Sequence, residues 1–184
     1  MTKETQNLAE LLRNSPFAKS HGKTSFRLVD TFKTLGLMLA ETEEESELVE
    51  QGHFEHYVPA FQRGNDKWTE EMQVAFIENL MKGFSTTLTC YNLGGLQHYI
   101  LDGLQRITAI KAFLLGDLKA FGLTYQELVE KYGRGIFKHS TVTILFYSFE
   151  SEAEAVNFYI DLNKNIGHSQ EDVDKAEKYL QQLQ

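Results

Sequence analysis

Helix-start signals alternate with β-rich segments along this chain. In three places a hydroxyl residue is followed, three positions later, by an acid, which is the pattern of a helical capping box. The pairs are Thr124 with Glu127, Ser151 with Glu154 and Ser169 with Asp172. Between the first two pairs, residues 141–149 are rich in β-branched and aromatic side chains, which predicts a central strand. The expected fold is therefore α/β of the α+β kind, a compact domain with a small mixed sheet flanked by helices.

Two more helices and a short strand can be placed from capping and spacing. A helix is expected to begin after Thr69, because the two acids that follow it would complement the positive end of the helix dipole. Gly83 marks its expected end. Residues 98–115 predict a strand, a tight turn at Gly103 and then a helix, since apolar residues recur there at helical spacing.

The N-terminal part of the chain predicts a separate appendage. Residues 2–13 fit a short helix, and a polar connector runs from there through Gly22 to a strand expected at residues 26–29. We therefore divide the chain into an N-terminal helix and connector, residues 1–25, and a domain formed by residues 26–184 with its C-terminal helices. Within that domain, residues 54–58 are expected to be extended, because the following proline disfavours helical backbone before it.

Composition excludes several classes of protein. The length of 184 residues suits one domain, and the net charge of −8 argues against broad, unaided binding to a nucleic-acid backbone. Six of the acids lie in residues 41–50, which we interpret as a solvated surface. Cys90 is the only cysteine, so an intrachain disulfide and a cysteine-built zinc site are excluded. No apolar run is long enough for a membrane span and the N-terminus is too polar for a signal peptide, so we expect a cytoplasmic protein without a membrane partner.

Two familiar catalytic patterns are missing. Gly22-Lys23-Thr24 has the ending of a P-loop, but Phe17 stands where that motif needs its first glycine, which excludes a Walker-type ATPase. The histidines lack the spacing of a metal-binding helix, and the identity of any metal ion is left open.

The segment 100–106 has the chemistry of an anion site. It joins an apolar strand end to an Asp-Gly turn and a helix start that carries glutamine and arginine. Gly103 allows the backbone to turn, the first helical turn offers unpaired N–H groups, and Arg106 offers a bidentate fork for a phosphate. Asp102 could orient Arg106, hold a metal-bound water or contact a sugar hydroxyl. By themselves, however, these residues also fit an ordinary turn with a surface arginine.

A second segment adds a family resemblance. Residues 57–63 read YVPAFQR and are followed by Trp68, while residues 101–110 read LDGLQRITAI. Together they resemble the N-terminal domain of GmrSD-type modification-dependent restriction enzymes, a branch of the ParB/sulfiredoxin-like superfamily, with its Ile/Val-Pro-x-Tyr/Phe-Gln-Arg and Asp-Gly-Gln-Gln-Arg patterns. Residues 158–163, FYIDLN, are similar to the family's Phe-x-x-Leu-Asn segment, which a Leu-Ser-x-x-Glu helix start follows. The resemblance spans roughly residues 54–176 in the family's order.

The resemblance implies a ParB/sulfiredoxin-like fold in which the Asp-Gly turn and the next helix cradle nucleotide phosphates, with NTP hydrolysis in several relatives. It implies an NTP of unspecified base as the ligand and Mg²⁺ as a candidate cofactor. Asp102 and Arg106 would be the catalytic residues, and Trp68 a packing residue. Matching positions assign the nucleotide site to Gln62, Arg63, Asp102, Gly103, Gln105, Arg106 and, nearby, Asn163.

Two departures from the family pattern shape the functional expectation. Leu104 replaces the first glutamine of Asp-Gly-Gln-Gln-Arg, so hydrolysis is less secure than binding. The chain also ends at Gln184 without the His-Asn-His nuclease domain of full-length relatives, so we expect DNA to be reached through a separately encoded partner protein. The leading hypothesis is a nucleotide-binding domain that hydrolyses or senses an NTP. A ParB-like small-molecule kinase and a non-enzymatic regulatory or DNA-associated module remain alternatives, and the oligomeric state is open.

Overall fold

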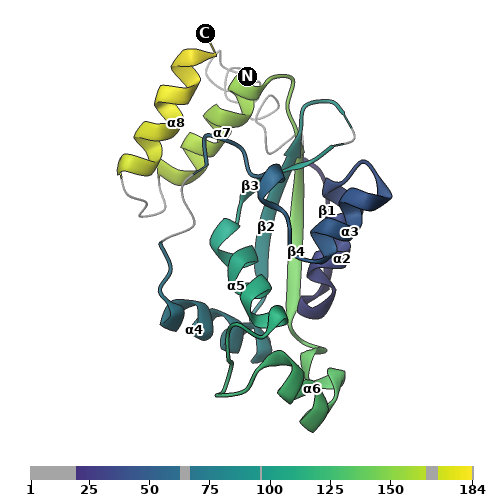
Figure 1. The fold of residues 1–184 in the computed structure, drawn as a ribbon. Coiled ribbons are helices and arrows are strands. Elements are labelled where there is room, and N and C mark those ends of the chain that lie inside the picture. The colour runs from purple at the N-terminus through teal and green to yellow at the C-terminus, as the bar shows by residue number, and fades with distance from the viewer. Residues whose placement is uncertain (1–19, 63–66, 96, 165–169, 184) are drawn as a thin grey trace, which may run out of the picture.

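The computed structural model describes residues 20–62, 67–95, 97–164 and 170–183, and its centre is a four-stranded mixed sheet (Figure 1). The strands lie in the order β1 (Ser20–Arg27), β4 (Thr141–Ser148), β2 (Thr86–Asn92) and β3 (Tyr99–Asp102). β4 pairs antiparallel with β1 and parallel with β2, and β3 pairs antiparallel with β2. The predicted central strand at 141–149 is confirmed by β4, which has a neighbour on each side.

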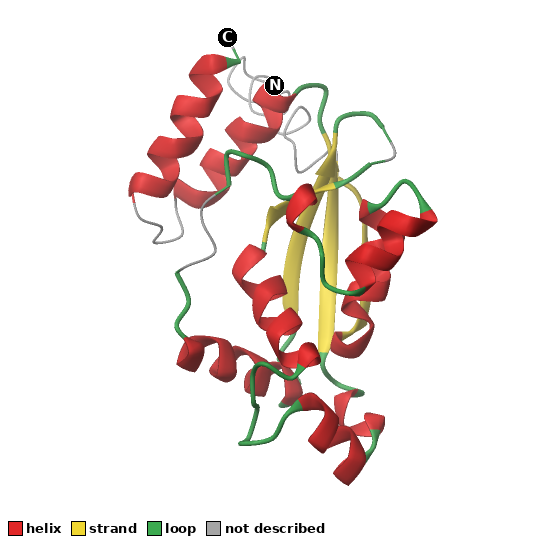
Figure 2. Ribbon diagram, viewed as in Figure 1, coloured by secondary structure: helices red, strands yellow, loops and turns green. Residues whose placement is uncertain are grey.

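Helices flank this sheet, as predicted (Figure 2). The helices are α2 (Thr31–Leu39), α3 (Glu43–Glu50), α4 (Glu70–Met81), α5 (Leu104–Leu115), α6 (Tyr125–Tyr132), α7 (Glu152–Lys164) and α8 (Gln170–Gln182). α7 and α8 pack on each other at one end of the sheet, and α6 lies toward the opposite end. α4 and α5 begin and end close to the predicted positions, and Thr69 caps α4 by accepting a hydrogen bond from the backbone N–H of Met72 at 3.4 Å.

The core is divided between the two faces of the sheet, because successive residues of a strand point to opposite sides. On one face, Leu88, Ile100 and Ile144 pack against side chains of α2, α4 and α5. On the other face, Tyr91 and Tyr147 join a second cluster with side chains of α7 and α8. α5 therefore packs in the larger core, whereas Leu101, just before its turn, belongs to the smaller aromatic one.

The N-terminal expectations need correction. β1 begins at Ser20, so the part of the predicted connector around Gly22 is strand, and the strand expected at residues 26–29 ends at Arg27. Pairing with β4 explains the difference, since Gly22 lies opposite Phe146 in the ladder and the backbone is extended by its partner. The predicted helix at 2–13 lies outside the described residues, and the division of the chain at residue 25 stays a prediction, although that position falls inside β1.

The segment before Pro59 also differs from expectation. Glu55–Tyr57 forms a 3₁₀ turn in which the backbone N–H of Tyr57 bonds the carbonyl of Phe54 at 3.0 Å. Only Val58 is extended, with φ −97° and ψ 115°. The prediction was wrong for 54–57 because a proline restricts only the residue directly before it.

Candidate functional site

The Asp-Gly turn places one glycine at a position that only glycine fits. β3 ends at Asp102 and α5 begins at Leu104, so Gly103 alone makes the turn, with φ 104° and ψ 13°. This left-handed backbone is costly for residues with a side chain. A Cβ atom on Gly103 would also lie 2.6 Å from Cδ2 of the fully buried Leu88. Gly103 therefore allows both the turn and the close approach of α5 to β2.

The first turn of α5 has no side-chain cap, because its N-cap residue is Gly103. The first N–H groups of any helix lack partners within the helix, and together with the helix dipole they attract negative groups. The sequence predicts a helix start with unpaired N–H groups here, and the geometry of the turn agrees with that prediction.

Asp102 and Arg106 form an ion pair within this turn. Arg106 Nη2 donates to Asp102 Oδ2 at 2.7 Å, and Nη1 donates to the main-chain carbonyl of Thr87 on β2. β3 pairs with β2 only as far as Thr89, so β3 supplies no donor for the Thr87 carbonyl and Arg106 supplies one. The two side chains are 20% and 27% exposed for Asp102 and Arg106, respectively. Of the roles open to Asp102 from sequence, orienting Arg106 is the one seen in the geometry.

Two buried glutamines fix the surrounding backbone. Gln62 Nε2 donates to the Ile100 carbonyl on β3 at 2.5 Å. Gln105 Oε1 accepts from the backbone N–H of Trp68 at 3.3 Å. The Trp68 ring in turn meets Phe76 edge to face with centroids 5.2 Å apart, which is the packing role predicted for it. These bonds hold the 58–62 segment and the start of α4 against the Asp-Gly turn.

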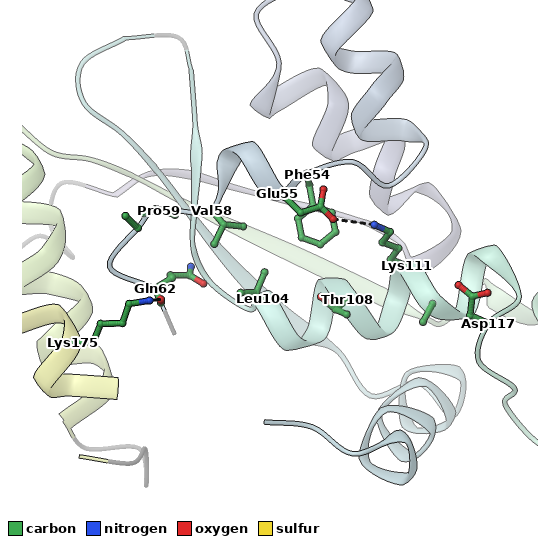
Figure 3. Close-up of a pocket in the computed structure, with 12 residues that line it drawn as sticks. Phe54, Glu55, Val58, Pro59, Gln62, Leu104, Thr108, Lys111, Asp117 and Lys175 are labelled. Atoms are coloured by element: carbon green, nitrogen blue, oxygen red, sulfur yellow. Dashed lines mark hydrogen bonds and ion pairs between the residues drawn. The ribbon is translucent and has the colours of Figure 1, made fainter. Parts of the chain in front are cut away.

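A pocket of about 600 Å³ runs along α5 beside this turn (Figure 3). One face of α5 supplies part of its wall, since Leu104, Thr108 and Lys111 recur at helical spacing. The rest of the wall comes from the 54–62 segment, from Asp117 after α5 and from α8. The lining residues are Phe54, Glu55, Val58, Pro59, Ala60, Gln62, Leu104, Thr108, Lys111, Ala112, Asp117 and Lys175. The volume is within the range of small-molecule sites, roughly 300–1,000 Å³.

Two lysines lie in the pocket wall in different settings. Lys111 Nζ bonds Glu55 Oε1 at 3.1 Å and sits 5.4 Å from the centroid of the Phe54 ring. Burial acts to raise the pKa of Glu55, but hydrogen bonds from its own backbone and from Lys111 outweigh burial and hold that pKa below its usual value. Lys175 Nζ reaches from α8 and donates to the main-chain carbonyl of Gln62.

The predicted site residues fall into three groups. Asp102, Gly103, Gln105 and Arg106 come together in the turn but do not line the pocket, whereas Gln62 does. Asn163 lies on α7, where its Nδ2 donates to the Tyr159 carbonyl at 2.7 Å. Arg63 lies outside the described residues. The functional roles assigned to all seven stay predictions.

Sequence reasoning missed most of the pocket wall. Thr108 and Lys111 could have been found, because they share a helical face with Leu104. Lys175 carried no local signal, since it is separated from Gln62 by 113 positions in the chain. Its place in the site depends on how α8 docks, which spacing alone does not reveal.

The described residues contain neither a cluster of metal-ligating side chains nor a membrane-spanning helix. Among them, no group of three or more His, Cys, Asp or Glu side chains could hold a metal ion. The carboxylate at the turn, Asp102, is bonded to Arg106, and Mg²⁺ as a cofactor stays a prediction. In that part of the chain there is also no helix with the length and apolar character to cross a membrane.

Comparison with known proteins identifies a family. Residues 45–184, well over half of the chain, match the family model described as the GmrSD restriction endonuclease, N-terminal domain. No similar curated protein and no similar solved structure was found. The matched range contains the YVPAFQR segment, the Asp-Gly turn and the FYIDLN segment, so the resemblance seen in the sequence is confirmed. The chain therefore belongs to the family of GmrSD restriction endonuclease N-terminal domains and is associated with restriction systems.

Proposed function

We propose that this domain binds a nucleoside triphosphate in the pocket along α5 and hydrolyses it. The observation that carries the proposal is the uncapped start of α5, set at a glycine turn beside a pocket of about 600 Å³. Helix starts of this kind are suited to phosphate groups, and the mostly apolar wall suits the flat face of a base. Membership of a restriction-enzyme family supports the proposal, because such a domain needs a way to regulate DNA cleavage.

Hydrolysis would need little covalent chemistry from the protein. Water attacks the terminal phosphorus, the bond to the bridging oxygen breaks, and nucleoside diphosphate and inorganic phosphate leave; rate enhancement comes from positioning and charge stabilisation. Arg106 lies in the turn beside the pocket and not in its wall, so as the candidate for stabilising charge on the phosphates it would act on a group that reaches the turn; its guanidinium is held there by Asp102 at 2.7 Å. Asp102 is the candidate for orienting the water. Mg²⁺ would enter as part of the nucleotide complex, since Mg²⁺ commonly takes its ligands from substrate phosphates.

One observation favours a second candidate, a nucleotide sensor without turnover. Leu104 lines the pocket at the position where the family motif carries glutamine. An apolar side chain there removes one polar contact to the phosphates while leaving the cavity in place. Binding and hydrolysis therefore need separate measurements.

Binding can be tested by thermal shift and calorimetry with ATP, GTP, CTP and UTP, each with and without Mg²⁺. A ligand that binds only the folded state raises the melting temperature, by about 2.7 kcal/mol of added stability at a hundred times its Kd. Ala60 lines the pocket and is exposed, so Ala60→Trp should block it without disturbing the core. Ala75 is exposed on α4 away from the pocket, so Ala75→Trp is the matched control and should bind normally.

Phosphate release separates the two candidates. Release with Mg²⁺ and no acceptor supports the hydrolase, while binding without release supports the sensor. Leu104→Gln should then raise the release rate of a weak hydrolase. If none of the four nucleotides binds wild type, or if Ala60→Trp binds as well as Ala75→Trp, the pocket is not a nucleotide site.

A further inference from the structure

The pocket along α5 has opposite charges at its two ends. In its middle, the charge of Lys111 is offset by Glu55 at 3.1 Å. Figure 3 shows the two remaining charged side chains far apart, with Lys175 beside Gln62 and Asp117 beyond the other end of α5. A ligand that fills the pocket therefore meets a cation at one end and an anion at the other.

The positive charge of Lys175 is not neutralised by any side chain that the structure describes. Its ammonium donates to the Gln62 carbonyl, and no carboxylate among the described residues lies within ion-pair distance of it. The carbonyl accepts one hydrogen bond but has no negative charge that would neutralise the ammonium. An ammonium has three donors. The remaining donors can bind an anionic group of a ligand.

Asp117 is the counterpart at the far end. Its backbone N–H donates to the Ala112 carbonyl at 2.8 Å, which fixes the residue just after α5. Within the described ranges no Lys or Arg forms an ion pair with its carboxylate. An ionised carboxylate only accepts hydrogen bonds, so this end of the pocket suits a donor group on the ligand.

The space between the two ends fits the size and chemistry of a nucleotide. α5 has 12 residues, so the helix that separates the two charges is about 18 Å long. Val58, Pro59 and Leu104 give the wall an apolar surface between them.

We propose that the pocket binds a nucleoside triphosphate in one orientation, with the polyphosphate on Lys175 and a hydrogen-bond donor of the base toward Asp117. This assignment rests on the proposed nucleotide binding and adds its two specificity contacts. Lys175 sets affinity for the phosphates, and Asp117 accepts a hydrogen bond from an amino or imino N–H at the edge of the base.

The phosphate end is tested with inorganic triphosphate, which has no base. Calorimetry should show that Lys175→Gln weakens triphosphate binding about tenfold or more, as expected for the loss of a charge-assisted hydrogen bond. Lys175→Arg should keep most of the affinity, because it keeps the charge. Lys178, exposed one turn farther along α8 and outside this pocket, gives the matched control: Lys178→Gln should bind within about twofold of wild type.

The base end is tested with the nucleotide that binds best among the four NTPs. Asp117→Asn should weaken that nucleotide about fivefold or more, because the amide oxygen carries no charge and is the weaker acceptor. Its triphosphate affinity should stay within about twofold, since a charge beyond the Debye length of about 8 Å is largely screened at physiological salt. Asp161→Asn, an exposed change on α7, should alter neither affinity.

The outcomes distinguish the two proposals. Nucleotides that bind wild type and Lys175→Gln equally, or an Asp117→Asn variant with unchanged nucleotide affinity, would overturn the orientation and leave nucleotide binding intact. If inorganic triphosphate binds and no nucleotide does, both proposals fail, as they do if neither binds. Loss of triphosphate with Lys175→Gln alone, and of nucleotide with either variant, supports the assignment.

Discussion

At the scale of single residues, Gly103 has the most demanding position in the site. Its positive φ and its distance from Leu88 are separate constraints, and each favours glycine. The sequence predicts the turn, because Asp-Gly between an apolar strand and a helical pattern is a turn signal. The contact with Leu88 could not be predicted, because β2 was not recognised as the neighbouring strand.

Replacing Gly103 by alanine should destabilise the fold more than the same change at Gly116. Both glycines have positive φ, 104° and 89°, but a Cβ at Gly116 meets nothing within 4 Å. Gly116→Ala should therefore lower the free energy of unfolding by about 1–2 kcal/mol. Gly103→Ala adds an overpacking cost of about 1–3 kcal/mol. Guanidinium titrations of both variants measure the difference, and equal losses would show that Leu88 yields without cost.

The charged residues of the motif were predicted in identity but not in all their contacts. Orienting Arg106 was one of three roles that the sequence left open for Asp102, and the ion pair at 2.7 Å is the one seen in the structure. The bond from Arg106 to the Thr87 carbonyl was not predictable, because it depends on where β3 stops. Local spacing thus allowed the pair without deciding it, and sheet register determines its surroundings.

At the scale of elements, the capping signals were reliable where they can be checked. Thr124 Oγ accepts from the Glu127 backbone N–H at 3.3 Å, and Glu127 Oε2 accepts from the Thr124 backbone N–H at 2.7 Å, which completes the capping box. Ser151 accepts from the Glu154 backbone N–H at 3.2 Å, while the Glu154 carboxylate bonds the backbone N–H of Glu150 instead. The third pair includes Ser169, which lies outside the described residues.

The capping box of α6 should be visible in the titration of Glu127. Hydrogen bonds from the Thr124 backbone and side chain lower the Glu127 pKa. Because the folded pKa lies below the unfolded one, this contribution to stability is present above the unfolded pKa and is lost as pH falls through the folded value. In Thr124→Ala, NMR titration should show the Glu127 pKa moving part of the way back, since the backbone bond remains.

Glu71 provides the control for that titration. Its pKa is lowered by a hydrogen bond with Thr69 at the start of α4, far along the chain from α6. Thr124→Ala should leave the Glu71 pKa where it is in wild type. A change in both residues, or in neither, would contradict the local explanation.

Two elements escaped prediction for physical reasons. β2 lacks an alternating pattern, because four of its consecutive residues, from Leu88 to Tyr91, are buried in a strand covered on both faces. α2 contains Gly36, a residue that weakens helices in isolation. A Cβ at Gly36 would lie 2.7 Å from Ser46 Oγ on α3, so the glycine is needed for the close packing of the two helices. In both cases tertiary contacts override the local signal.

At the scale of the whole molecule, the sheet and its flanking helices were predictable in kind but not in order. Capping pairs and β-rich runs predict which segments are helices or strands and in what order these elements follow one another along the chain. The order β1-β4-β2-β3 depends on pairings between distant segments, such as Thr86 with Val142. The pocket shares this dependence, since its walls come from the 54–62 segment, α5 and α8.

Cys90 can report on unfolding of the whole molecule. It lies in the middle of β2, and burial raises the pKa of its thiol to about 12. The native thiol should therefore resist a disulfide-exchange reagent at mildly alkaline pH, because the thiolate is the reactive form. Unfolding in guanidinium chloride should expose the thiol of Cys90 and make its labelling rapid. Fast labelling of the native protein would show that β2 opens without global unfolding.

The Cys90 thiol should also make the free energy of unfolding depend on pH. The folded pKa of Cys90 is above the unfolded value of about 8.5, so the free energy of unfolding is unaffected by this thiol below that pH. It falls as the pH rises from there toward the folded value of about 12. Cys90→Ala should remove this component of the alkaline loss of stability.

The short reach of β3 has a consequence for how the protein behaves in a crowded solution. Beyond the end of β3, the edge of β2 has no strand paired with it, and unpaired strand edges can pair with strands of other molecules. The Arg106 guanidinium donates to the Thr87 carbonyl at that edge, so this acceptor is already taken when another strand approaches. The arginine of the family motif thus also satisfies an exposed acceptor at the edge of the sheet, whatever ligand the neighbouring pocket holds.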